Sequence, residues 1–181
     1  YRIGNPACDE IRSKFNDCWM VSLSKNATSF VDNYNNNENF IHLFRKWRTL
    51  LETAEHTKNL WIYNFEKKIN EISKLHPKLL KIKSSNIEDD SFEDDLPVFL
   101  KSLSTTRLEE LILNISDNLV DYEESAVKFY TVHSYKGMEN NNVMVNKDVL
   151  DMLKNDSLNK VESNIYYVSI TRGMKTICLG K

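Results

Sequence analysis

Hydrophobic positions repeat with a helical period through the middle of the chain. Between residues 40 and 54 the apolar side chains fall at i, i+3, i+4 and i+7, which predicts an amphipathic helix built on Phe40, Leu43, Phe44, Trp47, Leu50, Leu51 and Ala54. A second stripe from Trp61 to Leu75 predicts another helix, which we expect to end at Pro77 because proline removes a backbone donor. Residues 97–119 return to the helical pattern. Aromatic side chains at this spacing are typical of a core, so we expect both stripes to be buried.

From residue 126 onward the apolar runs become shorter and predict strands. Residues 126–132 form a run of strand length, and the runs at 142–145 and 176–179 predict two further strands. Helices are predicted between them over residues 147–155 and 160–172. Strands that alternate with helices are typical of an α/β sheet, so the sequence predicts the α/β class.

This change of pattern predicts two parts in the chain. Residues 1–26, with a short helix and the strand-like run at 19–23, combine with residues 120–181 in the α/β domain. Residues 27–119 are predicted to be a mainly helical insertion. Residues 84–95 within it are so acidic that we expect a solvated surface loop rather than a metal-binding cluster of carboxylates.

Composition narrows the classes of partner. The 181 residues carry a net charge of -2, so a uniformly basic surface is excluded and any contact with nucleic acid must be local. No apolar run reaches the roughly 18 residues of a membrane-spanning helix, so we expect no membrane partner. The odd, widely spaced Cys8, Cys18 and Cys178 predict reduced thiols in an intracellular protein, with nucleus, cytoplasm and viral setting left open. Because the chain starts at Tyr1 without Met, we expect it to be cut from a longer protein.

The segment Thr131–Glu139, with the sequence TVHSYKGME, directly follows a predicted strand. Ligands of open α/β sheets bind beyond the carboxyl ends of the strands. The segment offers hydroxyls, an imidazole, an ammonium and a carboxylate, and Gly137 permits backbone angles that other residues resist. Such a loop suits a phosphate backbone, a nucleotide ribose, or both. A polar loop without a function is the alternative.

A second segment, residues 162–173, predicts a helix that Arg172 closes just before Gly173. An arginine held at a helix end beside a nucleotide is well suited to stabilise charge on a transferring phosphoryl group. The alternative is an arginine that interacts with the dipole at the helix C-terminus. The residues alone leave both readings open.

Together the two segments resemble motifs V and VI of UvrD/Rep-like superfamily 1 DNA helicases. TVHSYKGME is similar to the pattern T-[LV]-H-S-x-K-G-[LM]-E, and Tyr167–Arg172 is similar to Y-V-[AGS]-[IV]-T-R. Tyr1-Arg2 resembles the Tyr-Arg pair of motif IV. The chain departs from the family at Tyr135 and Gly173, where alanine is usual, and at Asn164, where arginine is common.

The resemblance implies a RecA-like second motor domain of the P-loop NTPase type, without its own P-loop, and a reduced 2B-like subdomain as the helical insertion. It implies that Arg172 contacts the γ-phosphate of ATP as the catalytic arginine. It places the nucleotide at Tyr1, Arg2, Gly137 and Glu139. It places single-stranded DNA at Thr131, His133 and Ser134.

The chain contains no Gly-x-x-x-x-Gly-Lys-Ser/Thr loop and no Asp-Glu pair after an apolar strand. The resemblance assigns those parts, and the ligands of the Mg²⁺ that accompanies ATP, to a first RecA-like domain of the same parent chain. We therefore expect the second half of an ATP-dependent 3′→5′ DNA helicase or translocase that is inactive alone. The alternatives are a degenerate, non-catalytic module that binds a partner or nucleic acid, and the motor part of a helicase-nuclease.

Overall fold

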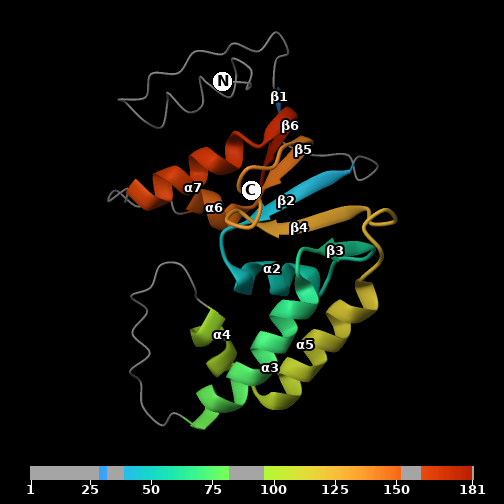
Figure 1. Cartoon of the computed structure of the whole chain (residues 1–181), viewed down its shortest axis with the longest axis vertical. Coiled ribbons are helices and arrows are strands. Elements are labelled where there is room, and N and C mark those ends of the chain that lie inside the picture. The colour runs from blue at the N-terminus through green and yellow to red at the C-terminus, as the bar shows by residue number, and fades with distance from the viewer. Residues whose placement is uncertain (1–28, 32–38, 82–95, 152–159, 181) are drawn as a thin grey trace. The chain divides into compact units, whose positions relative to one another are not determined.

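The computed structural model describes residues 29–31, 39–81, 96–151 and 160–180, and the chain divides into two compact units (Figure 1). The first unit combines Tyr1–Arg45 with Ala126–Lys181, and the second is Lys46–Ser125. Tyr1, Arg2 and the other elements predicted within residues 1–25 lie outside the described residues, as does the acidic loop predicted at 84–95.

The first unit is built on five parallel strands in the order β1-β6-β5-β2-β4. Their bounds are Ser29–Val31 for β1, Phe40–Phe44 for β2, Val127–Thr131 for β4, Asn140–Val145 for β5 and Gly173–Leu179 for β6. Two helices belong to this unit, α6 (Lys147–Asp151) and α7 (Lys160–Ile170), and α7 packs on β5 and β6. The predicted α/β class is confirmed, together with the strands and helices predicted from residue 126 onward in the part that the structure describes.

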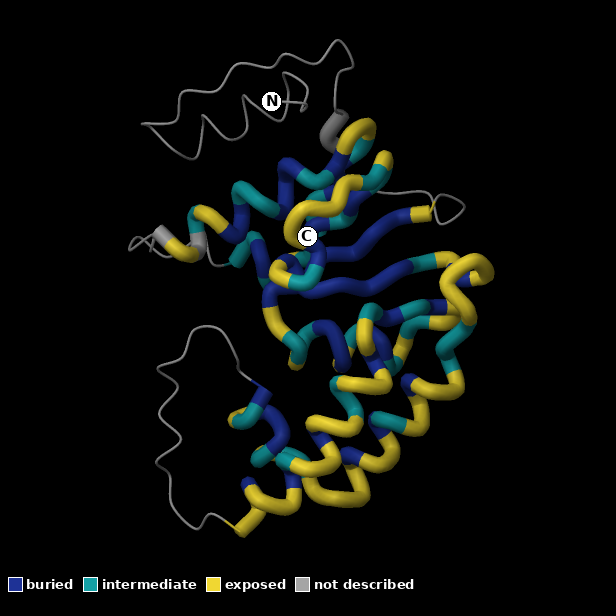
Figure 2. The backbone as a smooth tube through the Cα atoms, viewed as in Figure 1, coloured by how far each residue is buried: buried dark blue, intermediate teal, exposed yellow. Residues whose placement is uncertain are grey.

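Strand β2 shows that the helix predicted over residues 40–54 is wrong in its first half. Phe40–Phe44 form a central strand between β4 and β5, and all five residues are buried (Figure 2). A central parallel strand is covered on both faces, so it carries a continuous apolar run instead of an alternating one. The positions of Phe40, Leu43 and Phe44 also match a helical stripe, which is why the pattern misled. The helix itself, α2, begins at Trp47 and ends at Ala54.

The second unit contains α2, the short strand β3 (Leu60–Ile62) and the helices α3 (Phe65–Lys81), α4 (Leu96–Ser102) and α5 (Thr105–Asn118). Its core is made of apolar side chains from every one of these elements, among them Leu50, Leu51, Leu60, Ile72, Leu100, Leu111 and Ile115. The expectation that the helical stripes form a core is confirmed for the leucines and isoleucines of this list that belong to a predicted stripe, that is, all but Leu60. It is only partly correct for the aromatic side chains, because Trp47 and Trp61 are half-buried.

Two details of the predicted helices differ from the structure. Trp61 lies in β3, and Pro77 lies inside α3, which continues to Lys81. Proline has a φ angle compatible with a helix and removes one hydrogen bond, at a cost of about 3 kcal/mol. His76 and Leu79 lie on either side of Pro77 and are both buried, and that burial offsets the cost.

The helix predicted over residues 97–119 is two helices that meet near Ser104. The Ser104 side chain accepts a hydrogen bond from the backbone N–H of Arg107 and thereby caps α5. The guanidinium of Arg107 then donates two hydrogen bonds of 2.6 Å to the carboxylate of Glu55, just after α2. These bonds hold the pKa of Glu55 at about 2, below its usual 4.5.

The domain boundaries also differ from the predicted ones. The helical insertion was expected over residues 27–119, whereas the second unit is Lys46–Ser125. The start moves because β1 and β2 belong to the parallel sheet of the first unit. The end moves because Val120 donates a backbone hydrogen bond of 3.0 Å to the carbonyl of Leu60, which keeps the chain after α5 beside β3.

Two global properties follow from the described residues. None of their helices is both long and apolar enough to cross a bilayer. Cys178, the one cysteine among them, is buried in β6 and forms no disulfide with a described residue.

Replacing Gly173 by alanine should destabilise the first unit by about 1–3 kcal/mol, the usual cost of overpacking a core. Gly173 begins β6 beside a register shift, and an added Cβ would lie 2.6 Å from Cγ1 of Ile177 and 3.0 Å from the carbonyl oxygen of Thr176. Ile177 is fully buried, so its side chain would have to shift within a packed core. Urea unfolding would measure the change, with exposed Lys175→Ala as the control. An unchanged midpoint in Gly173→Ala would contradict this packing.

Candidate functional site

The segment predicted to carry chemistry connects opposite edges of the sheet. Thr131 ends β4 beside Phe44, at the carboxyl edge of β2. Asn140 begins β5 beside Gly173, the first residue of β6. Because β4 and β5 both run parallel to β2, residues 132–139 must return along the whole length of the strands. We call these eight residues the crossover loop.

The start of the crossover loop is a tight turn held by two hydroxyls. The backbone N–H of Ser134 donates to Oγ1 of Thr131 at 3.3 Å, and Thr131 Oγ1 donates to Ser134 Oγ at 3.1 Å. Ser134 Oγ in turn donates to the carbonyl of Thr131 at 2.9 Å. Thr131 is buried and Ser134 half-buried, whereas His133 is exposed. Of the three predicted DNA-binding residues, two therefore shape the turn and His133 presents its ring to solvent.

Tyr135 stands where the helicase motif usually has alanine. Its side chain is buried, and its ring packs edge-on against Tyr130 with 4.8 Å between the ring centroids. Tyr135 therefore anchors the crossover loop to β4. It neither crowds the loop nor offers a stacking ring on the surface.

Gly137 has a φ angle of +88°. A Cβ at this position would meet no heavy atom within 4 Å, so close packing does not require the glycine. The positive φ does require it, because side chains other than glycine rarely adopt this conformation. Gly137 thus lets the loop turn back toward the amino edge of the sheet, as the sequence predicted.

Arg172 joins the two motif segments directly. Its Nε donates to the carbonyl of Val168 in the last turn of α7 at 3.0 Å, and one terminal nitrogen donates to Thr171 Oγ1 at 3.0 Å. The other terminal nitrogen donates to the carbonyl of Met138 in the crossover loop at 3.2 Å. The interaction with the helix C-terminus that the sequence left open is therefore present.

The amino edge of the sheet gathers one group of predicted residues. The carbonyl of Arg172 accepts a hydrogen bond of 3.0 Å from the backbone N–H of Asn140, directly after Glu139. Glu139 itself is exposed. The structure thus brings Gly137, Glu139 and Arg172 to one edge. Thr131 ends β4, and His133 and Ser134 lie at the start of the same loop, by the carboxyl edge.

A groove of about 170 Å³ lies between the crossover loop and α7, and we call it the loop–helix groove. Its lining consists of Val132, His133, Lys136, Val161, Asn164, Ile165 and Val168. The sequence indicated one side of the groove, because Val161, Ile165 and Val168 fall on one face of a predicted helix. It gave no sign that this face meets residues of the crossover loop.

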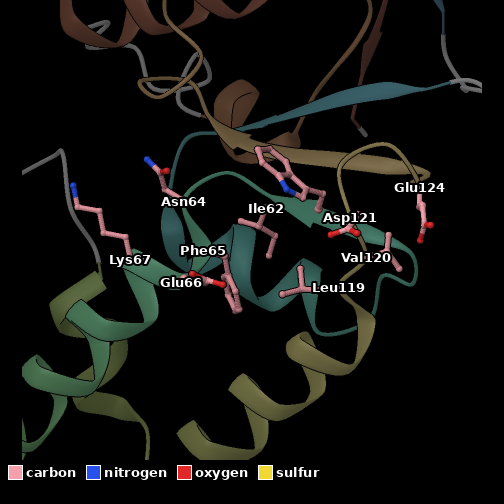
Figure 3. Close-up of a pocket in the computed structure, with 10 residues that line it drawn as sticks. Ile62, Asn64, Phe65, Glu66, Lys67, Leu119, Val120, Asp121 and Glu124 are labelled. Carbon is pink, nitrogen blue, oxygen red and sulfur yellow. The ribbon is translucent and has the colours of Figure 1, made fainter.

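A second pocket, of about 740 Å³, lies in the second unit and was not predicted (Figure 3). It opens where β3 and the start of α3 meet residues 119–124, and Lys67 is the one lysine or arginine among the described residues that line it. Three carboxylates, those of Glu66, Asp121 and Glu124, also line it. This excess of negative charge disfavours phosphate groups. The pocket therefore does not match the predicted ligands.

The described residues contain no cluster of side chains that could bind a metal ion. Within these ranges no three His, Cys, Asp or Glu side chains gather as a metal ion requires. The hypothesis that Mg²⁺ ligands belong to a first RecA-like domain stays a prediction.

Comparison with known proteins leaves the family open, and the resemblance to helicases depends on the two motif segments and Tyr1-Arg2 alone. No protein-family model matches the chain, and neither does any curated protein sequence.

Proposed function

We propose that this chain is the RecA-like second motor domain of an ATP-dependent 3′→5′ DNA helicase or translocase. It completes an ATP site with the first RecA-like domain of the same parent chain and carries part of a single-stranded DNA track. The parallel α/β sheet is compatible with such a domain. The polarity comes from the helicase resemblance alone.

One observation carries the proposal: the crossover loop links the residues assigned to DNA with those assigned to ATP. His133 stands at its start and Glu139 at its end. Turn hydrogen bonds run through the loop, from Tyr135 to the carbonyl of Thr131 at 3.1 Å and from Met138 to the carbonyl of Tyr135 at 3.1 Å. We propose that a loop bonded in this way couples its two ends. A motor needs such coupling between ATP hydrolysis and movement on DNA.

The residues at the amino edge fit a nucleotide. A guanidinium has five N–H donors, and the bonds of Arg172 to described residues use three of them. The two that remain suit a phosphate, and the three bonds keep the group oriented. Glu139 is exposed, as a contact between its carboxylate and a ribose hydroxyl requires. ATP supplies the phosphoryl group to be transferred, and Mg²⁺ is assigned to the first motor domain.

We further assign the second unit, Lys46–Ser125, as the counterpart of the helicase 2B subdomain. This assignment is supported by its position in the sequence, between two segments of the first unit. It contributes no residue to the ATP or DNA assignments.

A non-catalytic module is the second candidate. The hydrogen bonds of Arg172 to Val168, Thr171 and Met138 favour it, because they give the arginine a structural role without ATP. The motor of a helicase-nuclease would share the same site residues, so the nuclease is a question for the rest of the parent chain.

The coding sequence upstream of Tyr1 tests the proposal most directly. A working motor requires a Gly-x-x-x-x-Gly-Lys-Ser/Thr loop and an Asp-Glu strand there. The full-length product should hydrolyse ATP when single-stranded DNA is added, and residues 1–181 alone should not. A native chain without that loop would contradict the motor proposal and support the non-catalytic module instead.

Alanine substitutions in the crossover loop should weaken single-stranded DNA binding. His133→Ala should raise the Kd about 5-fold, the effect of losing one hydrogen bond of about 1 kcal/mol. Lys136→Ala should also reduce the slope of log K against log salt by about 0.7, the value for one phosphate contact on a single strand. Fluorescence anisotropy at several salt concentrations measures both effects, with exposed Lys74→Ala on α3 as the control. Unchanged Kd and slope in both loop variants would make the crossover loop purely structural.

A further inference from the structure

We infer that the loop–helix groove seats one unstacked base of the bound single strand, with Asn164 at its edge and Lys136 on its phosphate. This inference rests on the proposed function and adds Lys136, Asn164 and the apolar surface of the groove to the residues assigned to DNA. The groove measures about 170 Å³. Pockets for whole drug-sized ligands measure roughly 300–1,000 Å³, so this one suits a single ring better than an entire nucleotide.

The inner surface of the groove is apolar. Val132 comes from the crossover loop, and Val161, Ile165 and Val168 come from one face of α7. Val132 and Ile165 are buried, and Val161 is 42% exposed at the rim. Bases on single-stranded DNA present flat, weakly hydrated faces that gain from contact with apolar side chains. A base in the groove would therefore exchange contact with water for contact with apolar side chains.

The polar part of the lining is complementary to a nucleotide. Lys136 brings a cation and His133 an imidazole, and the described residues of the lining include no carboxylate. The pocket of the second unit differs in this respect, because it combines three carboxylates with one lysine. An apolar cleft with a cationic edge matches a base attached to a phosphate. An apolar side chain of a protein partner would leave Lys136 and His133 without a counterpart.

Asn164 gives the groove a means of recognising the base edge. It is exposed on α7, and its side-chain amide has two N–H donors and one carbonyl acceptor. Bases on single strands are read through hydrogen bonds to their edges once they are unstacked. Asn164 stands where the resembling helicases commonly carry arginine, so we expect this contact to distinguish the chain from them.

Two single-stranded probes of equal length test the inference: an oligothymidylate and a strand of abasic sugar-phosphates. The chain should prefer the oligothymidylate by about 5-fold or more, because one seated base is worth at least about 1 kcal/mol. The variant Asn164→Ala/Val168→Ala should lose that preference and keep its affinity for the abasic strand within about 2-fold. Both changes introduce a good helix former on α7, so the fold is expected to persist. Leu113→Ala, an exposed apolar change on α5, is the control.

The outcomes separate this inference from the proposed function. Equal binding of the two strands by the unaltered chain would overturn the base site and leave the DNA track intact. A preference that survives in the double variant would also overturn it. Failure to bind either strand would overturn the proposed DNA track, and the base site with it.

Discussion

Replacing Arg172 by alanine in the full-length parent chain should lower DNA-stimulated ATP turnover by about 10³-fold or more, the effect of removing a charge-stabilising arginine from phosphoryl transfer. The three hydrogen bonds to Val168, Thr171 and Met138 hold the guanidinium in place before ATP arrives. In the proposed ATP site, the two remaining N–H donors would meet the charge that develops on the γ-phosphate at little further cost of reorganisation. We expect kcat to fall far more than KM for ATP rises.

The same substitution also removes a link between α7 and the crossover loop, so controls must separate chemistry from structure. Arg172→Lys keeps the charge and loses the forked donor geometry, and we expect it to remain strongly impaired. Thr171→Val removes one of the bonds to Arg172 and keeps the guanidinium, and we expect turnover within a few-fold of the unaltered chain. Unfolding midpoints measured in parallel show whether the fold persists. Turnover in Arg172→Ala equal to that of the unaltered chain would remove the arginine from the reaction.

Acidification from pH 6.5 to pH 4 should destabilise the first unit by on the order of 3 kcal/mol through His42. His42 lies in the central strand β2, where its side chain is buried and its ring lies 5.3 Å from that of Phe129. Burial lowers the pKa of His42 from 6.5 to about 4, because the charged imidazolium would lose its hydration. The folded and unfolded pKa values of His42 differ by about 2.5, and a difference of one in pKa corresponds to about 1.4 kcal/mol, which gives this magnitude.

The direction follows from which state binds the proton. Below pH 6.5 the unfolded chain protonates His42 while the folded chain keeps it neutral, so protons favour unfolding. The stabilisation is complete above pH 6.5, declines toward pH 4, and is lost below that value. Glu55 acts in a separate window, because its folded pKa is about 2 and its usual value 4.5. Its contribution is present above pH 4.5 and declines as the pH falls toward 2.

Urea unfolding at several pH values tests the assignment to His42. Amide hydrogen exchange in β2 and β4 assigns the loss of stability to the first unit. His42→Phe removes the titrating group and keeps a ring beside Phe129, so its stability should stay nearly constant between pH 6.5 and 4.5. His133→Gln removes an exposed imidazole instead and should keep the decline of the unaltered chain. The same decline in His42→Phe as in the unaltered chain would assign the proton to another group.

Local patterns predicted the elements whose surroundings are also local. The strand at residues 127–131, the final strand at 173–179 and the helix before Arg172 each appear as apolar runs or stripes bounded by turn residues. The two motif segments were found for the same reason, because each is contiguous in the sequence. Even the need for glycine at position 137 followed from the turn that the motif requires.

The tertiary structure decided everything that depends on strand order. Periodicity reports which residues are buried and not what covers them, so it could not show that Phe40–Phe44 are a strand covered on both faces. The bond from Arg172 to Met138 joins positions 34 residues apart, and the loop–helix groove combines residues 132–136 with residues 161–168. These contacts exist because β4 and β5 flank β2 in parallel, which forces the crossover loop back along the sheet. The sequence alone therefore determined the elements and the candidate residues, whereas non-local strand pairing decided which of those residues meet.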